Sequence, residues 1–172
     1  MTRFNKPSKH LIDQQDLSID DLSIQQLLPH REPILLLERL LYCDDETCRV
    51  ALTINQKSAF YNQELAAVPA WVGIEYMAQA IAVWSGYQQL KKGQPILIGF
   101  LLGSRCYRCE QSLFSENQCL EVVTAVRYVD ETGLASFDCR IEDSAGTLLA
   151  SAAINAFRPD NPEQFVAQVR QN

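Results

Sequence analysis

The chain has 172 residues, of which 47% are hydrophobic, and its formal net charge at pH 7 is -6. This length and this hydrophobic content are typical of one globular domain with a full core and exclude a disordered chain. The acidic balance argues against a general nucleic-acid binder, because contacts to phosphate groups need a basic surface.

The first 20 residues are polar and unpatterned, which predicts a flexible N-terminal arm. They lack the apolar segment of a signal peptide, so we expect a cytoplasmic protein. The six cysteines are widely spaced in apolar or alternating stretches, as reduced and buried thiols usually are. Cys106 and Cys109 form a CxxC motif, but an odd separation on a strand points the two thiols to opposite faces, and we expect no metal site.

The N-terminal half of the domain begins with a short helix predicted at 21–28, capped by Asp20, Asp21 or Ser23 and ended by Pro29. An extended aliphatic run from Pro33 to Cys43 predicts the first strand. Residues 48–55 alternate well enough to form its antiparallel neighbour, with a turn at 44–47. A long connection, 56–68, follows, and such loops often carry function.

The stretch from Val68 to Leu90 is the centre of the predicted fold. It is apolar around nearly the whole helical wheel, so it predicts a helix that other elements cover on most sides. Glu75 and Gln79 lie four residues apart on one face, and Ala82 and Gly86 continue that row as a strip of small residues where backbone or ligand can come close. The carboxylate of Glu75 argues against a membrane span, because a central charge is costly in lipid.

Two structural interpretations of Glu75 compete with a role in a site. It could be a buried acid that backbone groups or an arginine satisfy, or it could emerge at a solvated edge of the helix.

Four strands are predicted after the helix, at 96–110, 118–129, 134–142 and 147–158, with short hairpin turns at 130–133 and 143–146. The economical arrangement is α+β, with one curved antiparallel sheet wrapped around one long central helix, which is a hot-dog fold. We expect the hot-dog domain at 21–158 and a C-terminal tail at 159–172 that could form a short helix. A second subunit would cover the open flank of the helix and the sheet edge, so the sequence predicts a dimer.

Two motifs resemble those of the (3R)-hydroxyacyl-[acyl carrier protein] dehydratases of type II fatty acid synthesis. LLPHREPILLLERL, residues 27–40, is similar to the family motif LLPHRxPxLLxDR, and PAWVGIEYMAQA, residues 69–80, is similar to the start of the family's central helix, PGxxxxEAxAQ. The longer stretch PAWVGIEYMAQAIAVWSG resembles more closely a divergent branch associated with aryl polyene pigment pathways. The resemblance spans about residues 21–158.

The resemblance implies that Glu75 is the catalytic acid. In that family a loop histidine from the other protomer works with this acid, while a helix N-terminus and backbone amides polarise the thioester carbonyl. Here Tyr61 stands where the histidine is expected, and one or two gaps would place Phe60 or Asn62 there instead. Tyr61 could serve only as a hydrogen-bond donor or acid, or its loop could merely line the pocket.

His30 offers a possible replacement for the missing group, although a structural role at the start of the first strand is the competing interpretation. We expect five residues to contact the substrate: Gln79, Asn62, Trp71, Arg105 and Arg108. The two arginines, with Lys91 and Lys92, could bind the phosphate of a phosphopantetheine arm or an acidic carrier protein, or they could be ordinary surface charges.

Three functions fit these observations. The first is dehydration of a 3-hydroxyacyl thioester on acyl carrier protein, in fatty acid or polyene biosynthesis, with no cofactor besides the carrier's phosphopantetheine. The second is thioester hydrolysis, in which a carboxylate orients water. The third is a non-catalytic or partner-dependent subunit that pairs with another hot-dog protein as a heterodimer, in place of a homodimer.

Overall fold

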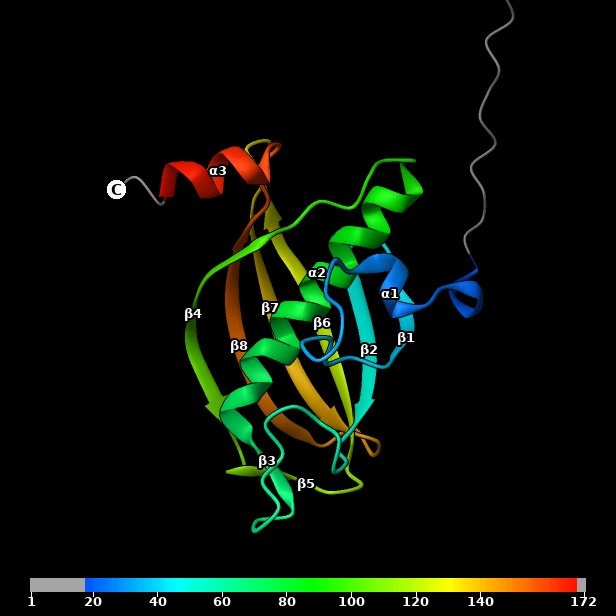
Figure 1. Cartoon of the computed structure of the whole chain (residues 1–172), viewed down its shortest axis with the longest axis vertical. Helices are drawn as coiled ribbons and strands as arrows, with labels where there is room; N and C mark the ends of the chain where they lie inside the picture. Colours follow the sequence, from blue (N-terminus) through cyan, green and yellow to red (C-terminus); the bar gives the residue numbers. More distant parts are fainter. Residues whose placement is uncertain (1–17, 170–172) are drawn as a thin grey trace, which may run out of the picture.

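A computed structural model describes residues 18–169. Helix α2 (Gly73–Lys91) follows a single turn of 3-10 helix, η2 (Ala70–Val72), and lies against one six-stranded antiparallel sheet (Figure 1). The largest fully buried apolar side chains of α2 are Tyr76 and Met77, which join the core that the sheet encloses. The predicted α+β hot-dog arrangement, a curved sheet around one long helix, is confirmed.

The sheet has the strand order β1-β2-β6-β7-β8-β4. Its strands are β1 (Arg39–Cys43), β2 (Thr47–Thr53), β4 (Phe100–Cys109), β6 (Cys119–Val129), β7 (Leu134–Asp143) and β8 (Leu148–Phe157). The four strands predicted after the helix are therefore present. Buried residues alternate regularly with more exposed ones along β7, and Ala135, Phe137, Cys139 and Ile141 are buried on the face toward α2.

The first strand is shorter than predicted, because it begins at Arg39 and not at Pro33. The backbone of residues 29–38 instead folds into a turn, in which the Ile34 and Leu35 N–H groups donate to the Arg31 carbonyl. The Gln79 side chain then binds the backbone at Ile34 and Leu36. Ile34, Leu35 and Leu36 therefore give backbone hydrogen bonds to α2 and to their own turn, whereas the Glu38 N–H already donates to the Ala51 carbonyl on β2.

Helix α1 (Ile24–Leu27) forms where a helix was predicted, and Ser23 caps it by donating its N–H to the Gln26 side chain. This helix crosses α2 at Gly86, whose missing side chain leaves room for the Leu27 carbonyl; a Cβ on Gly86 would overlap that oxygen. The predicted strip of small residues on α2 thus serves two purposes. Gly86 admits the backbone of α1, and Ala82 borders a cavity.

A second, two-stranded sheet was not predicted. It pairs β3 (Ala67–Pro69) with β5 (Leu113–Ser115), and the Ala70 N–H adds a bond to the Ser112 carbonyl. These backbone hydrogen bonds hold the long loop before α2 against the segment after β4. Both strands have only three residues, too few to show an alternating pattern in the sequence.

A short 3-10 helix lies near the start of the described residues, and an α-helix ends them. η1 (Ile19–Asp21) begins the described part, and the arm predicted at 1–20 lies outside it for residues 1–17. At the other end, α3 (Pro162–Val169) occupies most of the predicted tail, of which residues 170–172 lie outside the described part. Phe165 of α3 packs against Phe100 and Phe157, with ring centroids 5.0 Å and 5.2 Å apart.

All six cysteines are free thiols. Three are buried and three are exposed, so the prediction of buried thiols is right only for Cys43, Cys48 and Cys139. The exposed ones are Cys106, Cys109 and Cys119, which lie on β4 and at the start of β6. Within residues 18–169, no helix is both long and apolar enough to cross a membrane.

Candidate functional site

The Glu75 carboxylate is held by the side chain of Gln79, one turn further along α2. Gln79 is 2% exposed, and its Nε2 donates to Glu75 Oε1 at 3.0 Å and to the Ile34 carbonyl at 2.8 Å. The Oε1 of Gln79 accepts the Leu36 N–H at 3.0 Å. Since every bond of this amide has a fixed direction, the donor that faces Glu75 is fixed as well.

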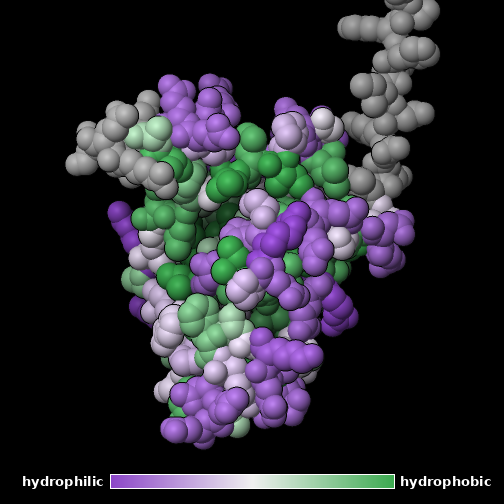
Figure 2. Space-filling model, in the orientation of Figure 1, coloured by the Kyte–Doolittle hydropathy of each residue, from purple (hydrophilic) through white to green (hydrophobic). Residues whose placement is uncertain are grey.

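A cavity of about 900 Å³ opens beside α2, and Glu75 forms part of its wall. Figure 2 shows a hollow bordered by hydrophobic side chains on the face drawn in Figure 1. The α2 residues that face the cavity include Ala78, Ala82, Ser85 and Gln89, which continue from Glu75 at helical spacing. The cavity therefore runs along the helix, away from the carboxylate.

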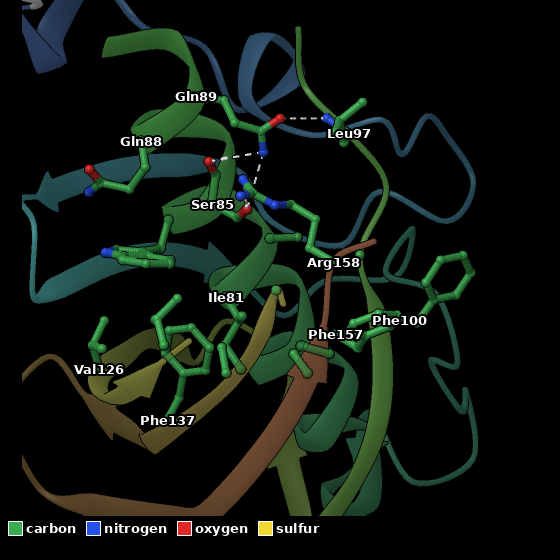
Figure 3. Close-up of a pocket in the computed structure, with 18 of the residues that line it drawn as sticks. Ile81, Ser85, Gln88, Gln89, Leu97, Phe100, Val126, Phe137, Phe157 and Arg158 are labelled. Atoms are coloured by element: carbon green, nitrogen blue, oxygen red, sulfur yellow. Dashed lines mark hydrogen bonds between the residues drawn. The ribbon is translucent and has the colours of Figure 1, made fainter. Parts of the chain in front are cut away.

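The walls beyond Glu75 are largely apolar and aromatic. The Phe137 ring lies beside the α2 residue Ile81, and Val126 and Phe157 also line the cavity, whereas the ring of Phe100, another lining residue, points away from Ile81 (Figure 3). The Trp84 ring packs edge-on against Phe137, with centroids 5.3 Å apart. A channel with this lining is suited to an apolar chain.

A polar group of residues lies at the far end of the channel. Gln89, which is 2% exposed, accepts the Leu97 N–H at 2.6 Å and donates to Ser85 Oγ at 3.2 Å (Figure 3). Arg158 Nη1 also lies 3.5 Å from Ser85 Oγ. These three residues were not predicted to belong to the site. Ser85 and Gln89 stand at helical spacing from Glu75, so the helix pattern could have indicated them, whereas no sequence pattern marks Arg158.

His30 lines the same cavity as Glu75. Its Nδ1 atom is buried and has no hydrogen-bond partner among the described residues. A buried polar atom without a partner costs free energy, so this nitrogen is the kind of group that a ligand or a second subunit could satisfy.

Tyr61 lies elsewhere within one protomer. Its hydroxyl donates to Glu116 Oε2 at 2.9 Å, and burial together with that carboxylate raises the pKa of Tyr61. Asn62 forms a turn, in which its Oδ1 accepts the Leu65 N–H at 3.0 Å. Phe60 packs edge-on against the exposed Trp71 ring at 5.5 Å, and none of these four residues lines the large cavity.

The basic residues are dispersed. In the β4–β8 register, Arg105 lies opposite Ala153 and Arg108 lies opposite Ser151, with a bulge between the two arginines. Ala153 and Ser151 are two residues apart on β8 and so share a face, and the two arginines opposite them share a face of β4. Both are exposed and outside the large cavity. Lys91 is paired with Asp45 at 2.7 Å, whereas Lys92 lines the cavity.

Of the residues predicted to form the site, the structure brings Glu75, Gln79 and His30 to one cavity. Trp71 lines a separate hollow of about 320 Å³ with Tyr107 and Cys109. Within residues 18–169, no group of three or more His, Cys, Asp or Glu side chains is arranged to hold a metal ion.

Comparison with known proteins matches the chain to a protein family. The model of the ApeP-like family, described as ApeP dehydratase, matches residues 22–167. The 3-hydroxyacyl-[acyl-carrier-protein] dehydratase FabZ of Xylella fastidiosa (strain M12) is 32% identical over 95 residues, which are 51% of this chain. This chain spans only 58% of the length of that relative.

Solved structures agree with the fold. The dehydratase heterocomplex ApeI:P from Xenorhabdus doucetiae contains a chain that superposes with a TM-score of 0.80 at 31% identity, covering 86% of this chain and 97% of that one. The PaaI protein of E. coli, from the phenylacetic acid degradation operon, superposes with a TM-score of 0.54 at 13% identity, covering 69% of this chain and 81% of that one. The second likeness shows the fold alone.

Proposed function

Since the chain belongs to the ApeP-like dehydratase family, we propose that it takes part in the dehydration of a 3-hydroxyacyl thioester carried by acyl carrier protein in polyene or fatty acid biosynthesis. The observation that supports this most is the Glu75 carboxylate, fixed by a buried amide at the head of a largely apolar channel. The phosphopantetheine arm of the carrier would present the thioester, and the acyl chain would extend along α2.

The reaction is an elimination of water. A base removes the proton on the carbon next to the thioester carbonyl, the double bond forms toward the next carbon, and the hydroxyl leaves as water after receiving a proton. Glu75 is the group that we assign to proton transfer at the hydroxyl. The Gln79 amide orients it, because its donor bond to Glu75 Oε1 leaves the second carboxylate oxygen for the substrate.

The second proton-transfer group has two possible sources. His30 belongs to the same chain, lines the same cavity and has a buried Nδ1 without a partner in the described part. A side chain of a second subunit is the other source. We assign the role to His30 first, because a neutral imidazole accepts a proton near neutral pH and a tyrosine does not.

The experiment is to incubate the purified protein with a 3-hydroxyacyl carrier thioester and to follow the enoyl product and free thiol together. Enoyl product without thiol release supports dehydration. Thiol release without enoyl product would instead make the protein a thioesterase and remove the proposal.

A partner-dependent subunit is the second candidate function, and the position of Tyr61 favours it. Tyr61 stands where the resemblance expects the loop histidine, and its hydroxyl is engaged with Glu116. The reaction is therefore also measured with a co-expressed hot-dog protein. Activity only in the mixture, and its loss in the His30→Asn chain, would separate a shared site from a subunit that only supports its partner.

We propose that the partner joins at β4, which ends the sheet and has no neighbour on its outer side in the described chain. Leu101 and Leu102 on β4 are 44% and 54% exposed, and Ile98, just before the strand, is 48% exposed. An unpaired edge with apolar side chains is suited to strand pairing with another chain. The similar Xenorhabdus doucetiae protein was solved in a dehydratase heterocomplex, so we propose a second hot-dog protein as the occupant. Co-purification from the native host tests it.

Carrier-protein docking is proposed for Arg105 and Arg108, two exposed cations on one face of β4 that form no salt bridge within residues 18–169. The double variant Arg105→Glu with Arg108→Glu should raise KM for the carrier-bound substrate and leave KM for the short pantetheine thioester unchanged. The matched control reverses Arg49 and Arg140, which already pair with Glu121 and Glu142 and lie outside the large cavity. Equal effects on both substrates would contradict docking at this face.

We also propose that the reaction needs no metal and takes place in the cytoplasm. The six free thiols suit a reducing compartment. A chelator should leave turnover unchanged, and cell fractionation should recover the protein with the cytoplasmic enzymes.

A further inference from the structure

Two buried thiols lie opposite each other in the hairpin of β1 and β2 (Figure 1). Cys43 is the last residue of β1, Cys48 lies at the start of β2, and the two are partners in the register of these strands. Cys43 is 3% exposed and Cys48 is 0% exposed, and both are free. Neither takes part in the reaction proposed at Glu75, so the pair has no role in that site.

The backbone places the two cysteines at the separation that a disulfide requires. The Asp44 N–H donates to the Thr47 carbonyl at 2.9 Å, so Asp44 and Thr47 form a hydrogen-bonded pair next to the turn. The two kinds of pair alternate along an antiparallel ladder, and the next pair, Cys43 with Cys48, is therefore of the non-hydrogen-bonded kind. The Cα atoms of such a pair are about 4.5 Å apart, within the range of about 4.4–6.8 Å found across disulfides.

The two side chains also meet. Both belong to the core, and opposite residues of a ladder share a face of the sheet. A hydrogen bond with the Cys43 side chain, and then burial, raise the pKa of the Cys48 thiol well above its usual value. The two sulfur atoms are therefore neighbours, and a bond between them needs no change in the register of the strands.

The other cysteines lie too far away to compete. Cys139, the third buried thiol, lies on β7, which is separated from β2 by β6. Two strand spacings of about 4.8 Å exceed the limit of about 7 Å between the Cα atoms of a disulfide. The exposed thiols, Cys106, Cys109 and Cys119, lie outside the core that encloses the pair. Cys43 is thus the partner that Cys48 can reach within one chain.

We propose that Cys43 and Cys48 form a reversible disulfide within one chain when the protein meets an oxidant such as glutathione disulfide. The Cys43 thiolate attacks one sulfur of glutathione disulfide, which forms a mixed disulfide and releases one glutathione. The Cys48 thiolate then attacks the Cys43 sulfur, which forms the new bond and releases the second glutathione. Two electrons pass from the cysteines to glutathione disulfide, and the two cysteine protons end on the two glutathione thiols.

Access to the buried thiols comes from the edge of the sheet. Among the described strands β1 pairs only with β2, so it can separate from β2 without breaking another strand pair. Cys43 lies on this edge strand and is therefore assigned the first step. Because the hairpin must open before each reaction, the exchange should be slow, and the closed disulfide is protected again by burial.

The disulfide would lie next to a turn that holds the end of α2. Gln88 Nε2 donates to the Asp44 carbonyl at 2.6 Å, and Lys91 pairs with Asp45 at 2.7 Å. Asp45 and Gln88 also line the large cavity. Oxidation would thus fix the hairpin against the helix that carries Glu75, whichever reaction the protein catalyses.

The test oxidises the folded full chain in glutathione buffers of increasing oxidised fraction. Remaining thiols are alkylated in denaturant, and trypsin, which cleaves after Arg39 and Arg49, puts both cysteines on the peptide 40–49. A disulfide within the chain lowers the mass of this peptide by two hydrogen atoms and prevents both alkylations. We expect this product, while Cys139 remains alkylated. In the most oxidising buffer, a peptide with two alkyl groups, or with glutathione on Cys43, overturns the proposal.

The same chain unfolded in urea is the control, because two cysteines in one short segment can also meet in a disordered chain. At a fixed concentration of reduced glutathione, the folded chain should be half oxidised at about tenfold less glutathione disulfide than the unfolded chain, because the hairpin holds the two sulfur atoms together. Cys139→Ala should leave this midpoint unchanged, and Cys43→Ala should abolish the product. Equal midpoints in the folded and unfolded chains would show that the fold does not favour the pair, and a midpoint that moves in Cys139→Ala would assign the bond to another thiol; either result overturns the proposal. No thioester is used, so the outcome does not depend on the proposed function.

Discussion

Gln79 donates a hydrogen bond to Glu75 from a side chain that is 2% exposed, and the same amide binds the backbone at Ile34 and Leu36. One residue thus joins the acid of the site to a segment more than 40 positions earlier in the chain. The orientation of the carboxylate and the path of residues 29–38 are consequently set together.

Replacing Glu75 by Gln should leave the fold intact and lower turnover by a factor of at least about 100, because a side-chain acid typically contributes between about 100-fold and 10,000-fold. The amide oxygen of the new residue can still accept from Gln79. Circular dichroism and urea unfolding serve as controls beside the enoyl assay. A variant with a native rate would show that the acid is not Glu75.

The Gln79→Met variant keeps the volume but removes the amide. We expect a loss of about 2 kcal/mol in the free energy of unfolding, because the Leu36 N–H and the Ile34 carbonyl lose partners. Gln25→Met, at an exposed position of α1, should cost less than about 0.5 kcal/mol. Urea unfolding measures both, and similar costs at the two positions would contradict the structural role of Gln79.

Gly86→Ala should destabilise the protein, although replacing glycine by alanine within a helix usually stabilises it. A glycine within a helix usually destabilises it by about 0.5–1 kcal/mol relative to alanine. Here the new methyl group would overlap the Leu27 carbonyl, so α1 must move and the protein should lose about 1–3 kcal/mol. Thermal unfolding of the native protein and the variant shows whether the substitution lowers or raises stability. A stabilised variant would mean that α1 is not packed closely on α2.

Stability should fall at alkaline pH because of Tyr107. Burial, and then the neighbouring Cys109, raise the pKa of the Tyr107 hydroxyl above 10, and burial also raises the pKa of Tyr76. A proton held more tightly in the folded state stabilises the protein below the unfolded pKa of about 10, and this contribution is lost as the pH rises through the higher folded value.

The measurement compares urea unfolding at about pH 8 and about pH 11. Tyr107→Phe should lower stability at the first pH by about 1 kcal/mol, because the bond to the Ala70 carbonyl is lost, and should show a smaller alkaline loss than the native protein. An unchanged alkaline loss would assign the effect to other groups.

The central helix and the strands after it could be predicted because their signals are local. The apolar pattern of residues 68–90 continues through about five turns of helix, and the hairpins at Gly133 and Gly146 are marked by Asp and Gly residues. Glu75 and Gln79 could be found for the same reason, since four residues along a helix fix a shared face.

The features that could not be predicted depend on contacts between distant residues. The first strand is shorter than its aliphatic pattern suggests because Gln79 binds its first half. The Tyr61 hydroxyl meets Glu116, 55 positions away, and no pattern in the loop indicates that partner. Arg158 reaches Ser85 across 73 positions, and no local pattern in the sequence indicates this pair.

The small sheet of β3 and β5 has a consequence for limited proteolysis. The loop tip at 62–66 is exposed, whereas Ala67–Pro69 beyond it is paired with Leu113–Ser115 and β2 before it is paired with β6. A protease that cuts between Gln63 and Glu64 would therefore give two fragments that remain bound to each other. We expect such a nicked protein to elute from a sizing column as one particle and to separate into two pieces only in denaturant.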